Sequence, residues 1–147
     1  MTDAVLIASR ALVGVAARSL AGVDAEVTLP QYRALVVLAS RGTQLVGELA
    51  ESLGIHPSTA TRLCDRLVSK RLVKRAIGRG NRRETRITLS AKGQDLVDQV
   101  TRVRRREIGG IVKRIPPDLW PPTVAALNAF ADAAGEVPQQ AWALGWS

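Results

Sequence analysis

The sequence predicts a mainly α-helical protein that carries one small β-hairpin. Its 147 residues are 46% hydrophobic but only 3% aromatic, so the core must be built from Leu, Val, Ile and Ala, a composition that favours helices over a β-sandwich. Apolar residues recur at helical spacing along most of the chain, and they alternate with a period of two in only two short neighbouring segments. A chain of this length fits one domain and can bury a core without disulfides.

Four helices are expected in the first half of the chain, at about residues 3–21, 30–40, 45–53 and 57–70. Glycines follow the first three, at Gly22, Gly42 and Gly54. Prolines, which a first helical turn tolerates, open the second and the fourth, at Pro30 and Pro57.

The pattern changes after residue 71. Residues 72–77 and 85–89 alternate between apolar and polar positions, and the Gly-Arg-Gly-Asn turn at 78–81 lies between them. Two such segments around a Gly-Asn turn predict a β-hairpin with a basic tip.

Helices are again expected after the hairpin. Ser90 can cap a long helix that runs to about residue 115, where two prolines end it. Gly109 and Gly110 lie inside this helix, and we expect a bend or a close helix contact there. A last helix is expected at about 121–134, and the tail that follows has no clear pattern.

The net positive charge of the chain lies in one stretch. Residues 56–86 hold ten Lys or Arg and two acidic residues, an excess equal to the formal charge of +8 of the whole protein. Concentrated positive charge creates a local field that attracts a polyanion, whereas an even spread would bear only on solubility.

The two helices around Gly54 have the pattern of a helix-turn-helix. This motif needs small or apolar residues at fixed offsets around a turn residue, and Ala50, Gly54, Ala60 and Leu63 meet that need. The second helix of the motif enters the major groove with its N-terminal residues at the base edges. An Arg-tipped hairpin just after it can reach the neighbouring minor groove, where the negative potential favours Arg. The combination predicts a winged helix-turn-helix.

The candidate DNA-binding residues lie on the polar face of helix 57–70 and at the hairpin tip: Ser58, Thr59, Thr61, Arg62, Arg66, Arg79, Arg82 and Arg83. Arg62 is the first choice for a base contact, because Arg grips guanine through two acceptors. The Ser and Thr hydroxyls are expected to divide between bases and phosphates. Basic residues beyond the helix are expected to contact the DNA backbone or to be solvated: Lys70, Arg71, Lys74 and Arg75.

Residues 46–93 resemble the MarR (multiple antibiotic resistance regulator) family of winged-helix repressors. The resemblance lies in Leu-Cys-Asp-Arg-Leu-Val at 63–68, Leu-Val-Lys-Arg at 72–75, and Asn-Arg-Arg-Glu-Thr-Arg-Ile-Thr-Leu-Ser-Ala-Lys-Gly at 81–93, the last of which matches the family's wing pattern. It implies a single domain over 1–147. Residues 30–90 would form the winged helix-turn-helix DNA-binding lobe, 3–21 and 91–134 the helical dimerisation region, and 135–147 a tail.

Two residues gain a role from the resemblance. Arg83 matches the wing Arg of the family, and Asp65 matches the acidic residue on the recognition helix that anchors the wing. Asn81 stands where the family usually has Asp, a departure that would make the wing looser or more positive.

The resemblance also implies a homodimer that regulates transcription. The outer helices hold more apolar length than a compact winged helix can cover; one chain could satisfy them, but an isologous dimer would bury the excess. Such a dimer sets two recognition helices about one helical turn apart on a palindromic operator. A small aromatic or phenolic effector would bind between the dimer region and the DNA-binding lobe and release a repressor from DNA.

Two other functions differ from this one in what they require. A sequence-tolerant architectural DNA-binding protein without an effector would show affinity that hardly varies with sequence and falls steeply with salt. An enzyme is not expected, because the sequence offers no acid–base, nucleophilic or metal set.

The single cysteine and single histidine exclude an intramolecular disulfide and a Cys/His zinc site, and no cofactor is expected. Cys64 lies on the inward face of its helix and is expected to be a buried structural thiol rather than a redox sensor. His56 is expected to cap the helix that Pro57 opens or to contact phosphate.

No apolar run is expected to approach the roughly 20 residues of a membrane span, because Arg10 and Arg18 interrupt the N-terminal segment. We therefore expect a cytoplasmic protein with no membrane partner.

Overall fold

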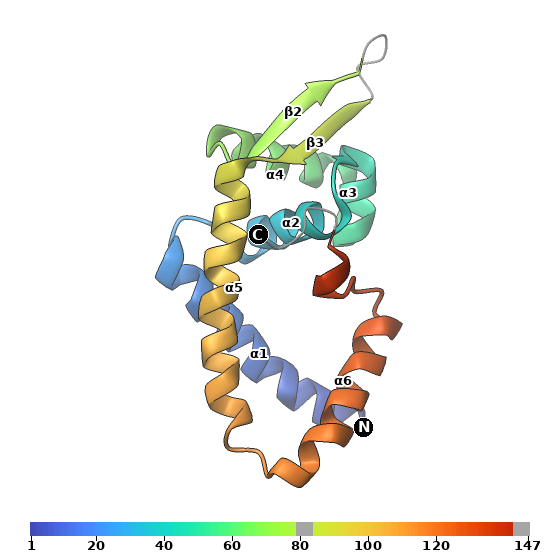
Figure 1. Ribbon diagram of the computed structural model, residues 1–147. Coiled ribbons are helices and arrows are strands. Elements are labelled where there is room, and N and C mark those ends of the chain that lie inside the picture. The colour runs from blue at the N-terminus through green and yellow to red at the C-terminus, as the bar shows by residue number, and fades with distance from the viewer. Residues whose placement is uncertain (79–83, 143–147) are drawn as a thin grey trace.

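The computed structural model describes residues 1–78 and 84–142, which form α-helices and a small antiparallel sheet at one end of the molecule (Figure 1). The elements, in chain order, are α1 (Thr2–Val23), α2 (Leu29–Arg41), β1 (Gln44–Leu45), α3 (Val46–Leu53), α4 (Pro57–Ser69), β2 (Val73–Ile77), β3 (Thr85–Leu89), α5 (Ala91–Val112), η1 (Pro117–Leu119), α6 (Trp120–Ala133) and η2 (Gln139–Ala141). The predicted fold class, mainly α with a hairpin, is confirmed.

Local sequence explains where the helices begin and end. Thr28 and Gln31 form a capping box at the start of α2, in which each side chain bonds the backbone N–H of the other. At the end of α3, Gly54 adopts a left-handed conformation (φ 63°), which costs little without a Cβ. His56 caps α4 by accepting the Ser58 N–H at 3.2 Å, as expected.

The sheet has the order β1-β3-β2, with both pairs antiparallel. In the hairpin, Val73 pairs with Leu89 and Ile77 with Thr85. The sequence did not reveal β1, because a strand of two residues is too short to show alternation. The hairpin turn at 79–81 lies outside the described residues.

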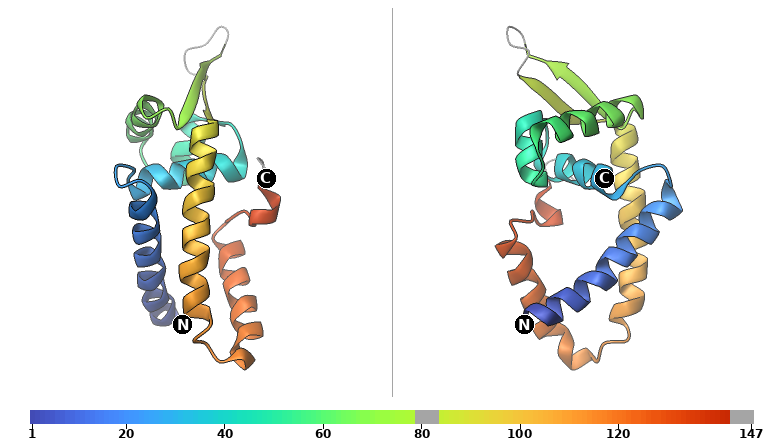
Figure 2. Two further views of the ribbon diagram at one scale, coloured as in Figure 1. Left: turned by 60° about the vertical axis from the view of Figure 1, so that its left-hand side comes forward. Right: turned by 180° about the vertical axis from the view of Figure 1, so that it is seen from behind.

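The core is aliphatic and lies in the lobe formed by α2, α3, α4 and the sheet, which we call the winged-helix lobe. Its fully buried side chains include Leu35, Leu38, Leu49, Leu67 and Ile87. Val97 and Val100 of α5 close the core from the side. The hairpin projects beyond this lobe at the end opposite the outer helices (Figures 1 and 2).

The start of α5 is locked against the end of α4. Ser90 caps α5 by accepting the Gly93 N–H at 3.0 Å, and its hydroxyl donates to the Arg71 carbonyl at 2.7 Å. A Cβ on Gly93 would lie 2.1 Å from the Leu72 carbonyl oxygen. Only glycine fits there, which explains the glycine that closes the family's wing pattern.

The outer helices, α1, the C-terminal half of α5, and α6, bury little within the chain. In α1, only Val15, Ser19 and Leu20 are buried, on the face that packs on α5. An ion pair between Arg18 and Glu107 (3.1 Å) adds to this contact. None of the 14 residues of α6 is buried.

The expectation for membrane spans needs a correction. By length and composition alone, α1 is apolar enough to cross a membrane, with a mean hydropathy of 1.6 over an 18-residue window of which 17% is buried. The two arginines do not lower the average enough, because Leu, Ile, Val and Ala occupy both the face on α5 and the face away from it. Composition near an N-terminus is weak support for a span, since helices of other kinds meet the same criterion.

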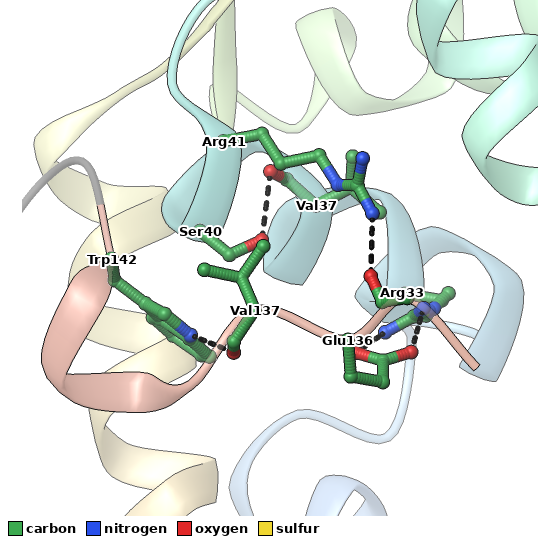
Figure 3. A network of polar contacts seen from close by, with 8 residues as sticks. Arg33, Val37, Ser40, Arg41, Glu136, Val137 and Trp142 are labelled. Carbon is green, nitrogen blue, oxygen red and sulfur yellow. Dashed lines mark hydrogen bonds and ion pairs between the residues drawn. The ribbon is translucent and has the colours of Figure 1, made fainter. Parts of the chain in front are cut away.

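The glycine pair near the end of α5 makes no close contact with the part of the chain that the structure describes. A Cβ on Gly109 or Gly110 would meet no atom within 4 Å, so the close helix contact expected there is absent among the described residues. The described part of the tail, in contrast, contacts the rest of the chain: Trp142 packs against the core and donates its indole N–H to the Val137 carbonyl at 3.1 Å (Figure 3).

Candidate nucleic-acid interface

The helix-turn-helix has the geometry that the sequence predicts. Helix α3 packs on α4, with Ala50 and Ala60 buried where the two helices meet and Leu63 beside them. The turn closes through a hydrogen bond from the Ile55 N–H to the Ala50 carbonyl (3.0 Å). Small residues at the crossing let the helices approach, and the opposite face of α4 points to solvent.

All five α4 residues predicted to contact DNA are exposed: Ser58, Thr59, Thr61, Arg62 and Arg66. The Thr61 hydroxyl donates to the Pro57 carbonyl at 3.0 Å, and the Ser58 hydroxyl lies 2.8 Å from His56 Nδ1. These two bonds orient the hydroxyls at the N-terminal end of the helix and leave oxygen lone pairs that can accept.

Arg62 and Arg66 face a cleft against the start of α2. This cleft, about 430 Å³ in volume, is also lined by Thr28, Gln31 and Thr59. Among residues 1–78 and 84–142, no carboxylate forms an ion pair with either arginine. Their guanidinium groups are therefore available to an anionic ligand, as nucleic-acid recognition requires.

Among the described residues, Asp65 pairs with an arginine that the family resemblance does not imply. Its carboxylate accepts from Arg75 of β2, so the base of the hairpin is tied to the recognition helix. Arg83, the implied partner, lies outside the described residues, as do Arg79, Arg82 and Asn81. Arg75, expected to contact DNA or to be solvated, serves instead in this ion pair, which is half-exposed (31% and 53%).

The remaining basic residues do not all join the α4 face. Lys70 donates to the Glu26 carbonyl in the loop before α2, and Lys92 donates to the Lys70 carbonyl at 3.1 Å. Arg71 has a positive φ of 60° at the end of α4, where it turns the chain into β2. Lys74 and Arg86 are exposed on the hairpin strands. The charge cluster is thus divided between the recognition face and the junction of α4 with α5.

Cys64 lies inside the recognition helix and is fully buried, as expected. Burial raises the pKa of its thiol above the ordinary value of 9.0; Arg75 opposes this shift and Asp65 adds to it. A thiol held protonated in a closed site is a poor nucleophile. In the described ranges, no group of three His, Cys, Asp or Glu side chains could hold a metal ion.

A larger cleft, of about 690 Å³, lies between α2, α5 and the segment after α6. Its lining combines apolar side chains such as Tyr32, Val36 and Ile108 with arginines from both helices. Sequence reasoning did not find this site, because the segment that forms one wall follows no periodic pattern. The only local signals were Gly135, a turn residue with φ 72°, and Trp142.

Comparison with known proteins agrees with this geometry. The structure of RV1404 from Mycobacterium tuberculosis is 44% identical, covers 93% of both chains and superposes with a TM-score of 0.86. Sco5413, a MarR family transcriptional regulator from Streptomyces coelicolor, is 26% identical over 91% of this chain and 92% of its own, with a TM-score of 0.64.

A curated relative also matches the centre of the chain. YsmB, an uncharacterized HTH-type transcriptional regulator of Bacillus subtilis, is 33% identical over 79 residues, which are 54% of each protein. The chain thus spans about half the length of the curated relatives it matches. The family model for the MarR family matches residues 25–84, which run from the loop before α2 to the wing. With the winged-helix fold and this similarity across the lobe, the chain belongs to the MarR family of transcriptional regulators.

Proposed function

We propose that this protein is a homodimeric, sequence-specific DNA-binding repressor that acts in the cytoplasm. The observation that carries the proposal is the exposed face of α4, on which two hydroxyls are oriented by the helix itself and two arginines lack carboxylate partners among the described residues. Arginine and hydroxyl side chains at the N-terminal end of a recognition helix are suited to base edges and phosphates. Arg79, Arg82 and Arg83 lie outside the described residues, and their proposed role is to contact the neighbouring minor groove.

The proposed dimer would cover the apolar surface of the outer helices. Large apolar side chains of these helices are exposed by 43–65%: Leu6, Ile7, Leu12, Val13, Trp120, Val124, Leu127 and Phe130. An exposed patch of this kind marks an interaction surface. A second copy supplies the same apolar helices by symmetry, which favours a dimer over insertion of α1 alone into a membrane. In this division of the chain, the outer helices are the dimerisation region and 30–90 the DNA-binding lobe.

The cleft between α2 and α5 is the proposed effector site. Its volume of about 690 Å³ falls within the range of small-molecule pockets, and it lies between the winged-helix lobe and the outer helices. A ligand that binds one arrangement of these two regions better than the other would shift the population between them. Release from the operator follows when the favoured arrangement no longer matches the spacing of the half-sites.

The decisive experiment is selection of bound DNA from a random pool with the full-length protein. A homodimer with two recognition helices should enrich a palindrome whose half-sites are about one helical turn apart. Enrichment of an asymmetric site would contradict the dimer, and no enrichment at all would contradict sequence-specific binding.

An architectural DNA-binding protein is the second candidate, favoured by the part of the basic cluster that lies off the recognition face. It would bind all sequences with similar affinity and lose affinity steeply with salt. Affinity for the selected site and for a scrambled site, measured at several salt concentrations, separates the two candidates.

A further inference from the structure

His56 determines the direction in which the Ser58 hydroxyl bonds. The backbone N–H of Ser58 lies 3.2 Å from His56 Nδ1. Because a backbone N–H can only donate, Nδ1 is the unprotonated nitrogen of the ring. The Ser58 Oγ lies 2.8 Å from the same nitrogen. An unprotonated ring nitrogen can only accept, so the Ser58 hydroxyl donates its proton to His56.

The Thr61 hydroxyl is also a donor within the helix. It donates to the Pro57 carbonyl oxygen, one turn earlier in α4, at 3.0 Å. A hydroxyl has one proton and two lone pairs, and both Ser58 and Thr61 use that proton inside the protein. Each exposed oxygen therefore presents only lone pairs to a ligand.

These two oxygens lie on one edge of the exposed α4 face, together with a carboxylate. Thr61 is three residues after Ser58, and Asp65 is four residues after Thr61, a spacing that places the three side by side on a helix. Asp65 accepts from Arg75 and keeps 53% of its side chain exposed. We call Ser58, Thr61 and Asp65 the acceptor edge, because its oxygens can accept further hydrogen bonds.

The other edge of the α4 face has the opposite polarity. Thr59 and Arg66 line the cleft beside the start of α2, and Arg62 lies between the two edges and borders the same cleft. The Thr59 hydroxyl makes no hydrogen bond within the described part of the chain, so its proton is available. Guanidinium groups are donors only. Thr59 and Arg66, which we call the donor edge, are therefore suited to phosphate oxygens, which only accept.

We propose that the acceptor edge accepts hydrogen bonds from the exocyclic amino group of an adenine or a cytosine in the major groove. Adenine N6 and cytosine N4 are the donors that this groove presents. Guanine O6 and N7, thymine O4 and the phosphate oxygens are all acceptors, and they repel the lone pairs of Ser58 and Thr61. The inference rests on the proposed sequence-specific function, and it adds which hydroxyls contact bases and which base edges they select.

The hydrogen bonds within α4 favour acceptance over donation. To donate to DNA, Ser58 would have to give up its bond to His56. Thr61 would likewise have to give up its bond to the Pro57 carbonyl. Neither bond is lost when the same oxygens accept from an amino group, and a hydroxyl that donates is polarised into a better acceptor. The negative charge of Asp65 on the same edge adds to the repulsion of phosphate.

Base analogues test the proposal with the wild-type protein and the operator selected from the random pool. Purine in place of adenine, or pyrimidin-2-one in place of cytosine, removes the amino group at one position at a time. At one or two positions of each half-site, the analogue should weaken binding by about three- to tenfold, as loss of one hydrogen bond predicts. The analogue that has this effect identifies the base. The same analogue outside the selected site is the control for weakened base pairing.

A second analogue separates the amino group from the rest of the base edge. Where purine weakens binding, 7-deazaadenine, which keeps the N6 amino group and lacks the N7 acceptor, should bind as adenine does. Loss of affinity with 7-deazaadenine alone would mean that the protein donates to N7 at that position, which would overturn the assigned polarity.

Protein variants assign the effect to the acceptor edge. Ser58→Ala and Thr61→Val should each bind the natural operator about three- to tenfold more weakly. Each should also lose nothing more at the analogue position that its own oxygen contacts, as a double-mutant cycle requires. Thr59→Val is the matched control on the donor edge. It should weaken binding about equally for all single-base variants of the operator and keep the full sensitivity to the analogues.

An operator that tolerates loss of every amino group would overturn the inference, and so would full sensitivity to the analogues in both Ser58→Ala and Thr61→Val. Either result would leave sequence-specific binding intact, because the selection defines the operator before any analogue is introduced. Failure to enrich an operator would instead contradict the proposed function, and the inference with it.

Discussion

The winged-helix lobe and the outer helices are built from the same aliphatic residues but bury them to different extents. In α2, seven of 13 residues are buried, whereas in α6 none of 14 is. The lobe therefore has a core that one chain completes. The outer helices present apolar faces that the described residues do not cover. The two regions therefore differ in their source of stability: the lobe depends on its own packing, and in the proposed dimer the outer helices depend on a second copy.

The largest expected effect comes from charging the outer helices. Leu127→Asp with Phe130→Asp should weaken the proposed dimer by about 10²- to 10⁴-fold. Full burial of an apolar side chain contributes about 1.5–3 kcal/mol. Only about half of each of these two remains exposed for a partner to bury (55% and 56%), and each appears twice in a symmetric dimer. Analytical ultracentrifugation measures the dissociation constant.

Asn128→Asp is the matched control, since it adds a charge to an exposed polar position of the same helix. An unchanged dissociation constant in the double variant would show that α6 does not contribute to the dimer interface. Loss of the cooperative unfolding of the lobe would contradict the independence of its core.

Gly93→Ala tests the lobe at its tightest point. The added methyl would meet the Leu72 carbonyl oxygen and the Leu89 side chain at 2.1 and 2.7 Å, so the free energy of unfolding should fall by about 3 kcal/mol. Urea denaturation measures it. Gly47→Ala, where nothing lies within 4 Å, should change stability by no more than about 1 kcal/mol, toward higher stability. Equal effects of the two substitutions would contradict the close approach of α5 to β2.

Arg62→Ala tests how the winged-helix lobe recognises DNA. The operator affinity should fall by about 1–3 kcal/mol, with preference relaxed at one base position. Binding to a panel of operators that differ by single bases measures both. Arg114→Ala, at an exposed position after α5, serves as a control for the loss of one charge. A uniform drop across the panel would make Arg62 a phosphate contact instead.

The ion pair between Asp65 and Arg75 should make a smaller contribution to the free energy of unfolding. Because both side chains are partly exposed, a double-mutant cycle with Asp65→Asn and Arg75→Gln should give a coupling energy of about 0.2–1 kcal/mol in urea denaturation. Lys74→Gln replaces an exposed neighbour on the same strand and should show no coupling with Asp65→Asn. A coupling energy of zero would mean that the pair does not hold the hairpin to α4.

Cys64 gives the smallest effect, and one that depends on pH. Burial raises the pKa of its thiol in the folded protein. Above the ordinary thiol pKa, the unfolded state therefore loses a proton that the folded state retains. The free energy of unfolding falls as the pH rises through this range. The free energies of unfolding of wild type and Cys64→Ala should therefore converge as the pH rises above about 9. Alkylation by iodoacetamide should be slow until the protein is unfolded; rapid alkylation of folded protein would contradict burial.

Much of the fold was predictable because its signals are local. Pro57 and Gly54 mark helix boundaries through backbone geometry alone, and the alternation at 85–89 gave the bounds of β3 as the structure has them. The polar face of α4 could be predicted equally well, because helical spacing places Ser58 and Arg62 on one face of the helix.

What the sequence did not reveal depends on contacts between distant segments. Three features join residues that no periodicity relates. They are the pairing of Asp65 with Arg75, the cleft between α2, α5 and the segment after α6, and the packing of Trp142 against the core. In α1, the two interrupting arginines conceal a high mean hydropathy, because the average over the helix depends mainly on its many Leu, Ile, Val and Ala residues.

The lock between Ser90, Gly93 and the end of α4 has a mechanical consequence. With 22 residues, α5 is about 33 Å long, and its first turn is clamped to the chain that leaves the recognition helix. The helix is thus a rigid lever arm: a tilt of about 5° displaces its far end by roughly 3 Å. In the proposed dimer, small adjustments where the two subunits meet would therefore reorient the α4 face that is proposed to contact DNA.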